Sequence, residues 1–121
     1  MIGTGNTFLM QDGSEKRHLW IVLQIRPVHK EKICAIVNIS SKRCPSGKCR
    51  GTIAPKIHSF LSKTSYIRCD HARAIPAKTL ESLLKKGKIR LKEDCPPTLL
   101  EKIRQTVGTC SRSSKEVKDL L

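Results

Sequence analysis

Aromatic side chains are scarce in this chain. Among its 121 residues only Phe8, Trp20, Phe60 and Tyr66 are aromatic. So few rings argue against the broad base-stacking surface that RNA-recognition modules use. The hydrophobic fraction of 38% and the charged fraction of 28% are those of a globular chain. The length suits one domain, so we predict a single domain over residues 1–121.

Acidic residues are scarce as well. The chain has 10 Asp and Glu against 24 Lys and Arg, and Asp70 is the only acid between residues 32 and 80. This argues against a nuclease centre built from magnesium and carboxylates. The sequence also lacks a phosphate-binding glycine loop, a nucleotide fingerprint and an HExxH motif. We therefore expect no cofactor, and we expect any RNA cleavage to proceed without metal.

Long hydrophobic runs are missing too. The longest, "LWIVL" (19–23) and "ICAIV" (33–37), are far shorter than a membrane span, and the N-terminus has no signal-peptide pattern. We expect a cytoplasmic protein with no membrane partner. In that compartment its six cysteines are expected to be thiols.

Positive charge is what the chain has in excess. Its formal net charge is +14, and residues 42–78 hold nine Lys and Arg against one acid. Such an excess favours a polyanionic partner, nucleic acid above all, although a generally basic surface for solubility is the alternative.

The apolar pattern changes near Pro76, from strand-like to helix-like. Strands are predicted over 3–12, 17–25 and 33–41, and again at both ends of 52–67, with loops over 13–16, 26–32 and 42–51. Helices are predicted over 77–88, ending at Gly87, and over 113–121 behind a Ser113–Glu116 capping box. A third helix is predicted over 94–108, with Leu99, Leu100, Ile103 and Val107 on one face. Strands followed by helices predict an α+β fold, a curled antiparallel sheet with a β core over 1–76 and a helical part over 77–121.

Several side chains suggest phosphate or proton chemistry. Arg17 precedes a buried strand, where its guanidinium can bind a phosphate, and Ser40 and Ser41 end another strand. His58 and His71 are candidate general acids or bases. Each has an ordinary alternative: a surface arginine, hydroxyls that bond a turn, and packed or solvated histidines.

A zinc site is a further alternative. Cys44, Cys49, Cys69 and His71 are four residues of ligand type, although their spacing is not the paired CxxC pattern of zinc knuckles. The basic residues around these cysteines would also lower thiol pKa values, which would make the thiols redox-reactive.

The order of these motifs resembles the MazF/PemK-like toxin family, especially its divergent plasmid-maintenance branch. The resemblance runs from about Gly5 to Cys110. It rests on "GNTF" (5–8), "RHLWIVL" (17–23), "VNISS" (37–41) and, most specifically, "IHSFLSKTSYIRCDHARAI" (57–75). The chain departs from the family pattern at His18, where proline is usual, and at Ile57 and Ser59, where this branch favours aspartate and proline.

The resemblance implies an SH3-like small β-barrel with C-terminal helices, usually a homodimer. It also implies a toxin of a toxin–antitoxin system: a metal-independent endoribonuclease that cleaves single-stranded RNA and is inhibited by an antitoxin. Arg17 matches the family's catalytic arginine and Ser40 its catalytic threonine or serine. His58, Ser65 and Tyr66 match the branch pattern only.

Together these observations give a hypothesis for the site. The RNA 2′-hydroxyl attacks the adjacent phosphate and leaves a 2′,3′-cyclic phosphate, with His58 or Arg17 as base and with Arg17 and Ser40 stabilising charge. The predicted RNA-binding residues are Ser41, Lys42, Arg43, Lys48, Lys56, Lys63, Ser65, Tyr66 and Arg73. A non-catalytic module that binds nucleic acid or protein on the same barrel is the alternative, and a zinc-stabilised interaction domain is another.

Overall fold

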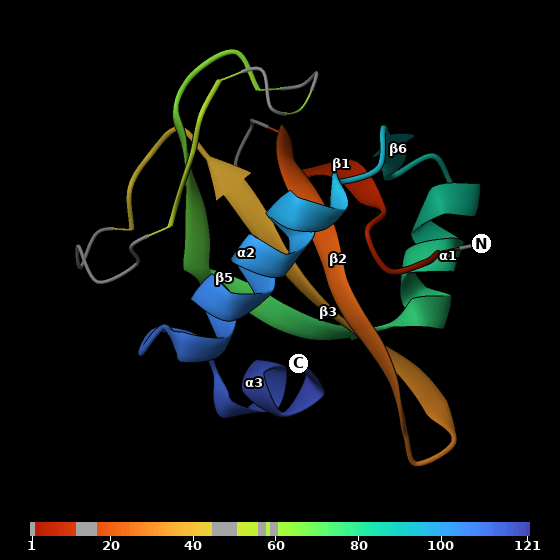
Figure 1. Ribbon diagram of the computed structural model, residues 1–121. Helices are drawn as coiled ribbons and strands as arrows, with labels where there is room; N and C mark the ends of the chain where they lie inside the picture. Colours follow the sequence, from red (N-terminus) through yellow and green to blue (C-terminus); the bar gives the residue numbers. More distant parts are fainter. Residues whose placement is uncertain (1, 12–16, 45–50, 56–57, 59–60) are drawn as a thin grey trace.

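The computed structural model describes residues 2–11, 17–44, 51–55, 58 and 61–121. The elements within them are β1 (Thr7–Gln11), β2 (Arg17–Val28), β3 (Glu31–Ser40), β4 (Thr52–Ile53), β5 (Ser65–Pro76), α1 (Ala77–Lys85), β6 (Arg90–Lys92), α2 (Pro97–Thr109) and α3 (Lys115–Leu120). The strands pair antiparallel in one sheet, in the order β4-β5-β3-β2-β1-β6, which curls into a half-barrel (Figure 1). The predicted α+β class is confirmed.

The sheet buries side chains on both faces, because successive residues of a strand point to opposite sides. One face, here the α2 face, packs against α2 and α3 (Figure 1) through Leu9, Leu19, Ile21, Val37, Ile39, Ile67 and Cys69. The other, here the α1 face, packs against α1 through Phe8, Trp20, Val22, Cys34 and Ile36. Two apolar clusters therefore lie on either side of one sheet.

The predicted helix α2 is confirmed in its position and in its buried face. Pro97 stands at its first turn, where a missing N–H has no effect on the helix. Of the four residues predicted on its apolar face, Leu100, Ile103 and Val107 are buried and Leu99 is half-buried.

The predicted glycine stop of α1 is also confirmed. Gly87 has a φ of 72°, and it ends the helix in a Schellman motif. Its N–H donates to the Leu84 carbonyl at 3.1 Å, and the Lys88 N–H donates to the Leu83 carbonyl at 2.9 Å.

The predicted capping box of α3 is wrong by one residue. Ser114, rather than Ser113, is the N-cap, and its Oγ accepts a hydrogen bond from the Val117 N–H at 3.3 Å. This register turns Val117 and Leu120 into the apolar cluster under the helix, whereas Ser113 is itself buried.

The predicted loop over residues 26–32 is wrong. β2 and β3 continue through it and meet in a two-residue turn at His29 and Lys30, whose φ angles are 50° and 66°. Positive φ at both central residues is the type I′ geometry that fits the twist of a hairpin. His-Lys stands where a tight hairpin usually has Asn-Gly or Asp-Gly, so the turn carries no recognisable sequence signal. Pro27 suggested a loop, yet it pairs with Lys32 inside the hairpin.

The segment 77–121 also contributes a strand that was not predicted. β6 pairs antiparallel with β1, with Thr7 opposite Lys92 and Leu9 opposite Arg90. β6 is only three residues long and its alternation was hidden between two helices. β1 begins later than predicted, at Thr7, because Gly5 has a φ of 88° and the chain turns there.

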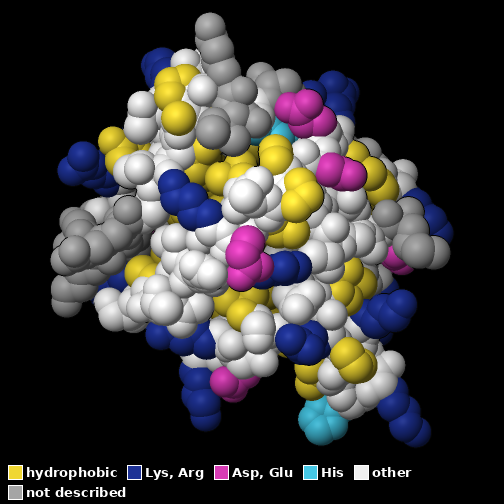
Figure 2. All heavy atoms as spheres, in the orientation of Figure 1, with side chains coloured by type: hydrophobic (Ala, Val, Ile, Leu, Met, Phe, Trp, Pro, Cys, Tyr) yellow, Lys and Arg dark blue, Asp and Glu magenta, His cyan; other side chains and the backbone are white. Residues whose placement is uncertain are grey.

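Within the described parts of the chain, no helix is both long and apolar enough to cross a membrane. Figure 2 shows the α2 side of the molecule, where Lys and Arg side chains are spread over the view with several acidic side chains among them. The described residues form no concentrated basic patch in this view.

Candidate functional site

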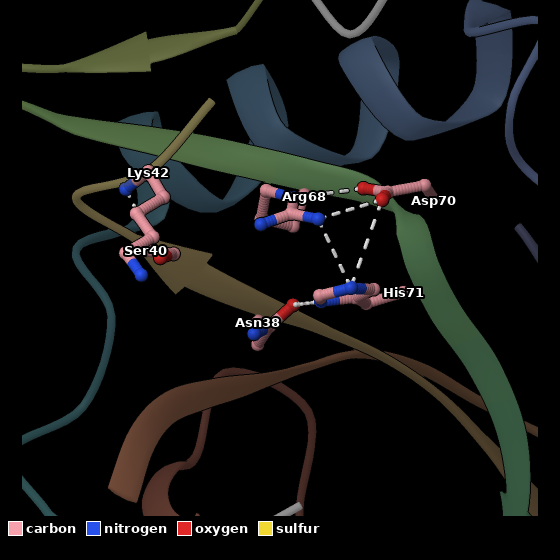
Figure 3. A network of polar contacts seen from close by, with 6 residues as sticks. All are labelled: Asn38, Ser40, Lys42, Arg68, Asp70 and His71. Carbon is pink, nitrogen blue, oxygen red and sulfur yellow. Dashed lines mark hydrogen bonds and ion pairs between the residues drawn. The ribbon is translucent and has the colours of Figure 1, made fainter. Parts of the chain in front are cut away.

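A polar network lies on the α1 face of the sheet, where β3 and β5 meet (Figure 3). Arg68 donates from Nε to Asp70 Oδ1 at 2.9 Å and from Nη2 to Asp70 Oδ2 at 2.7 Å. The same Nη2 lies 3.0 Å from His71 Nε2, and His71 Nδ1 lies 3.0 Å from Asn38 Oδ1. These four residues, Asn38, Arg68, Asp70 and His71, are called the His71 network below.

An irregularity of strand pairing creates this network. Asn38 pairs with Arg68, but Ile36 pairs with Arg73, so β5 carries extra residues at this point. Regular alternation would turn His71 away from Arg68. The extra residues bring Asp70 and His71 beside both Arg68 and Asn38.

The hydrogen bonds define the tautomer of His71. A guanidinium group can only donate, so His71 Nε2 accepts from Arg68. The neutral ring then carries its proton on Nδ1 and donates to Asn38 Oδ1. The His71 side chain is 40% exposed, whereas Arg68 is 10% exposed. An imidazole in a defined tautomer is therefore accessible from solvent.

Asp70 is held as a carboxylate by its partner. The hydrogen bonds from Arg68 lower the pKa of Asp70, more than partial burial raises it. The network thus combines one anion, one cation and one titratable imidazole in direct contact.

Two more arginines lie on the same face of the sheet. The Arg73 guanidinium carbon lies 4.5 Å from the centre of the Trp20 ring, and that of Arg43 lies 5.2 Å from the centre of the Tyr66 ring. Trp20 pairs with Asn38, which pairs with Arg68, so the network lies in the same row as Trp20. Arg43 and Arg73 are both exposed. This face therefore presents cationic groups around the His71 network.

Ser40 is next to the network but is partly engaged. It pairs with Tyr66 and is 6% exposed. Its Oγ accepts a hydrogen bond from the Lys42 backbone N–H at 3.1 Å, the turn-bonding alternative that its position allowed (Figure 3). Ser65 is also bonded locally, since its Oγ donates to the Lys63 carbonyl at 3.0 Å.

Arg17 and Ser40 reach the same end of the sheet but not the same face. Leu19 pairs with Ile39, so the pleat places Arg17 with Leu19 on the α2 face and Ser40 on the α1 face. Arg17 is exposed and pairs with Gln11 on β1. The two residues that resemble a catalytic pair are therefore separated by the sheet.

His58 lies in a different place again. Its side chain is 2% exposed, and its Nε2 lies 2.8 Å from the Glu93 carbonyl and 3.2 Å from Thr7 Oγ. Because a carbonyl oxygen only accepts, Nε2 carries the proton in this arrangement. Thr7 also donates to the Glu93 carbonyl, at 2.6 Å. His58 thus connects its loop to β1 and to the residue after β6.

The remaining predicted RNA-binding residues fall into two groups. Ser41, Lys42 and Lys63 are exposed in the structure. Lys48 and Lys56 lie outside the described residues, as does Cys49.

Among the candidate zinc ligands that the structure describes, Cys69 and His71 lie on different faces of the sheet. Cys69 packs on the α2 face, with its Sγ 4.0 Å from the Thr106 carbonyl, whereas His71 lies on the α1 face. In the described ranges no group of three or more metal-ligating side chains occurs. Five described cysteines are buried thiols, as expected, namely Cys34, Cys44, Cys69, Cys95 and Cys110.

Burial makes two of these thiols, Cys34 and Cys95, less acidic than a free cysteine, and therefore less reactive. Burial raises the pKa of Cys95 to about 11. Burial, together with the nearby charge of Glu81, raises that of Cys34 to about 11. Both side chains remain protonated near neutral pH.

Sequence reasoning did not assign Asn38, Arg68, Asp70 or Trp20 to the site. One signal was present: in "YIRCDHARAI" the only acid of a long basic stretch stands two residues after an arginine, on the same face of a regular strand.

Comparisons with family models, curated proteins and solved structures found no match to this chain.

Proposed function

We propose that this chain is a metal-independent endoribonuclease that cleaves single-stranded RNA to a 2′,3′-cyclic phosphate. Its resemblance to MazF/PemK-like proteins implies that the chain has an SH3-like barrel fold and forms a homodimer. It would act as a toxin that an antitoxin inhibits. The observation that carries the proposal is the His71 network, an accessible imidazole beside guanidinium groups on one sheet face. Imidazole and guanidinium supply proton transfer and phosphate binding without metal.

In this mechanism His71, rather than His58, acts as the base. RNA displaces Arg68 from His71 Nε2, and this nitrogen takes the proton of the 2′-hydroxyl. The bond between O2′ and phosphorus forms while the bond between phosphorus and O5′ breaks, and water protonates the leaving O5′. Arg68 and Arg73 stabilise charge on the phosphate, and such donors contribute about 2.7–4 kcal/mol each. Ser40, on the same face, can donate its O–H to a phosphate oxygen.

His58 is less suited to this role because of its contacts. It is 2% exposed and its Nε2–H is directed at the Glu93 carbonyl. Arg17 is on the opposite face of the sheet from Ser40. To contact a phosphate bound beside Ser40, the Arg17 side chain would have to reach past the end of β2.

The test is incubation of the purified protein with a mixed-sequence RNA in excess EDTA, followed by mapping of the product ends. We expect discrete cuts with cyclic-phosphate ends, slowed about 10²- to 10⁴-fold in His71→Ala, the usual range for loss of a general base. His29→Asn is the matched control, because it removes an exposed hairpin histidine and suits positive φ. Arg17→Ala tests the residue that the resemblance nominates.

Intact RNA in the presence of the folded protein would overturn the proposal. So would full activity of His71→Ala, and if Arg17→Ala were then inactive the site would be at the other face of the sheet.

A non-catalytic nucleic-acid-binding module is the second candidate. It is favoured by the contact of Arg68 with His71 Nε2, which occupies the nitrogen that a base requires. This function predicts an RNA complex that weakens steeply with salt, without cleavage. If RNA is neither cut nor bound, the basic surface needs a protein partner instead.

A further inference from the structure

Two of the few aromatic rings in this chain have an arginine guanidinium packed against them. Trp20 of β2 is fully buried, and Arg73 reaches it from β5, across β3, with its guanidinium carbon 4.5 Å from the ring centre. Tyr66 is half-buried under Arg43, at 5.2 Å. In both pairs the arginine itself is exposed, so one side of its guanidinium faces the ring while the residue as a whole faces solvent.

A guanidinium group held in this way is a stacking surface. Its charge is delocalised over a flat group, and it stacks on aromatic planes. Unpaired nucleobases of RNA stack on arginine planes as well as on aromatic rings. The ring beneath fixes the arginine, so less side-chain freedom is lost when a base is bound.

The two pairs flank the His71 network. Trp20 is opposite Asn38 and Tyr66 is opposite Ser40, with one strand between them. From the usual strand spacing and rise per residue, the rings lie about 12 Å apart on one face. Asn38 and Arg68 lie between them.

We propose that Arg73 on Trp20 and Arg43 on Tyr66 are two stacking platforms for unpaired nucleobases, on either side of the phosphate that faces the His71 network. This inference rests on the proposed RNA-binding face and names what that face recognises: the bases of a single strand, in addition to its phosphates. The platforms would place the scissile phosphate between two held bases.

The test uses Trp20 as the probe, because it is the only tryptophan of the chain. The ligand is a 2′-O-methyl oligoadenosine, which has no 2′-hydroxyl and is not cleaved by this mechanism, and the control is inorganic polyphosphate of the same charge. We expect the oligonucleotide to change Trp20 emission. It should bind roughly 100-fold more tightly than polyphosphate, because stacking is worth about tenfold per base and each of the two platforms holds one base.

Arginine-to-lysine variants separate the two platforms, since lysine keeps the charge but not the plane. Arg73→Lys should abolish the emission response and weaken oligonucleotide binding roughly tenfold. Arg43→Lys should weaken binding similarly and keep the emission response. Both variants should lose less affinity for polyphosphate than for the oligonucleotide, because lysine keeps the charge that attracts phosphate.

Equal affinity for polyphosphate and oligonucleotide, or wild-type behaviour of Arg73→Lys, would overturn the platforms. The outcome is distinct from that of the cleavage assay. If the protein stacks bases but leaves RNA intact, the platforms are supported and the ribonuclease proposal is wrong. If it cleaves RNA without stacking bases, the ribonuclease proposal is supported and the platforms are wrong.

Discussion

His58 and His71 lie in one stretch of sequence, yet they have opposite surroundings in the fold. His58 is 2% exposed and carries its proton on Nε2, which is directed at the Glu93 carbonyl. His71 is 40% exposed and carries its proton on Nδ1, which is directed at Asn38. Both have a carboxylate within ion-pair distance, Glu93 at 3.8 Å and Asp70 at 3.6 Å. A nearby acid therefore does not distinguish a structural histidine from an available one; burial and hydrogen-bond direction do.

The largest expected difference between the two histidines is in stability. His58→Ala removes a buried ring and its bond to the Glu93 carbonyl, and we expect the free energy of unfolding to fall by about 2–4 kcal/mol. His71→Ala, at a partly exposed position, should cost about 1 kcal/mol or less. Urea denaturation monitored by Trp20 fluorescence measures both.

The RNA cleavage rate per folded molecule should respond in the opposite way to stability. His58→Ala should keep the wild-type rate, whereas His71→Ala should lose cleavage. If His58→Ala were as stable as the wild type and inactive, His58 would be the base and the comparison would be inverted.

The sequence alone predicts the main helices and strands, but it does not predict the different surroundings of His58 and His71. Periodicity predicted α2 and its buried leucine, isoleucine and valine, because burial of a helix face depends on local spacing. The faces of Arg17 and Ser40 followed from strand alternation, but only once the pairing of Leu19 with Ile39 was known. The His71 network needs the irregular pairing between Ile36 and Asn38, which depends on two strands distant in the chain. The burial of His58 depends on Glu93, after a strand that was not predicted.

A smaller effect is expected from the ion pair that only the His71 network has. The Arg68 hydrogen bonds lower the pKa of Asp70 below its ordinary 3.8, so the folded state binds this proton less well than the unfolded state. The stability contributed by Asp70 is therefore fully present above about pH 3.8 and is lost as the pH falls through the lower folded-state pKa. In urea denaturation at a series of pH values, the wild type should exceed Asp70→Asn above this range and converge with it below. A difference that does not change with pH would mean that Asp70 acts without its charge.

The smallest effect is the position of a single proton. At a pH where both rings are neutral, ¹⁵N NMR should assign the proton to Nε2 in His58 and to Nδ1 in His71, because a carbonyl accepts in the first case and a guanidinium donates in the second. Arg68→Leu removes the guanidinium from His71 Nε2 and should shift that ring toward a mixture of tautomers, while His58 is unchanged. The spectra then show directly which nitrogen can take a proton from a ligand. If His71 instead carried its proton on Nε2, Arg68 would not be its donor, and the proposed base would have to act through the other ring nitrogen, which faces Asn38 rather than solvent.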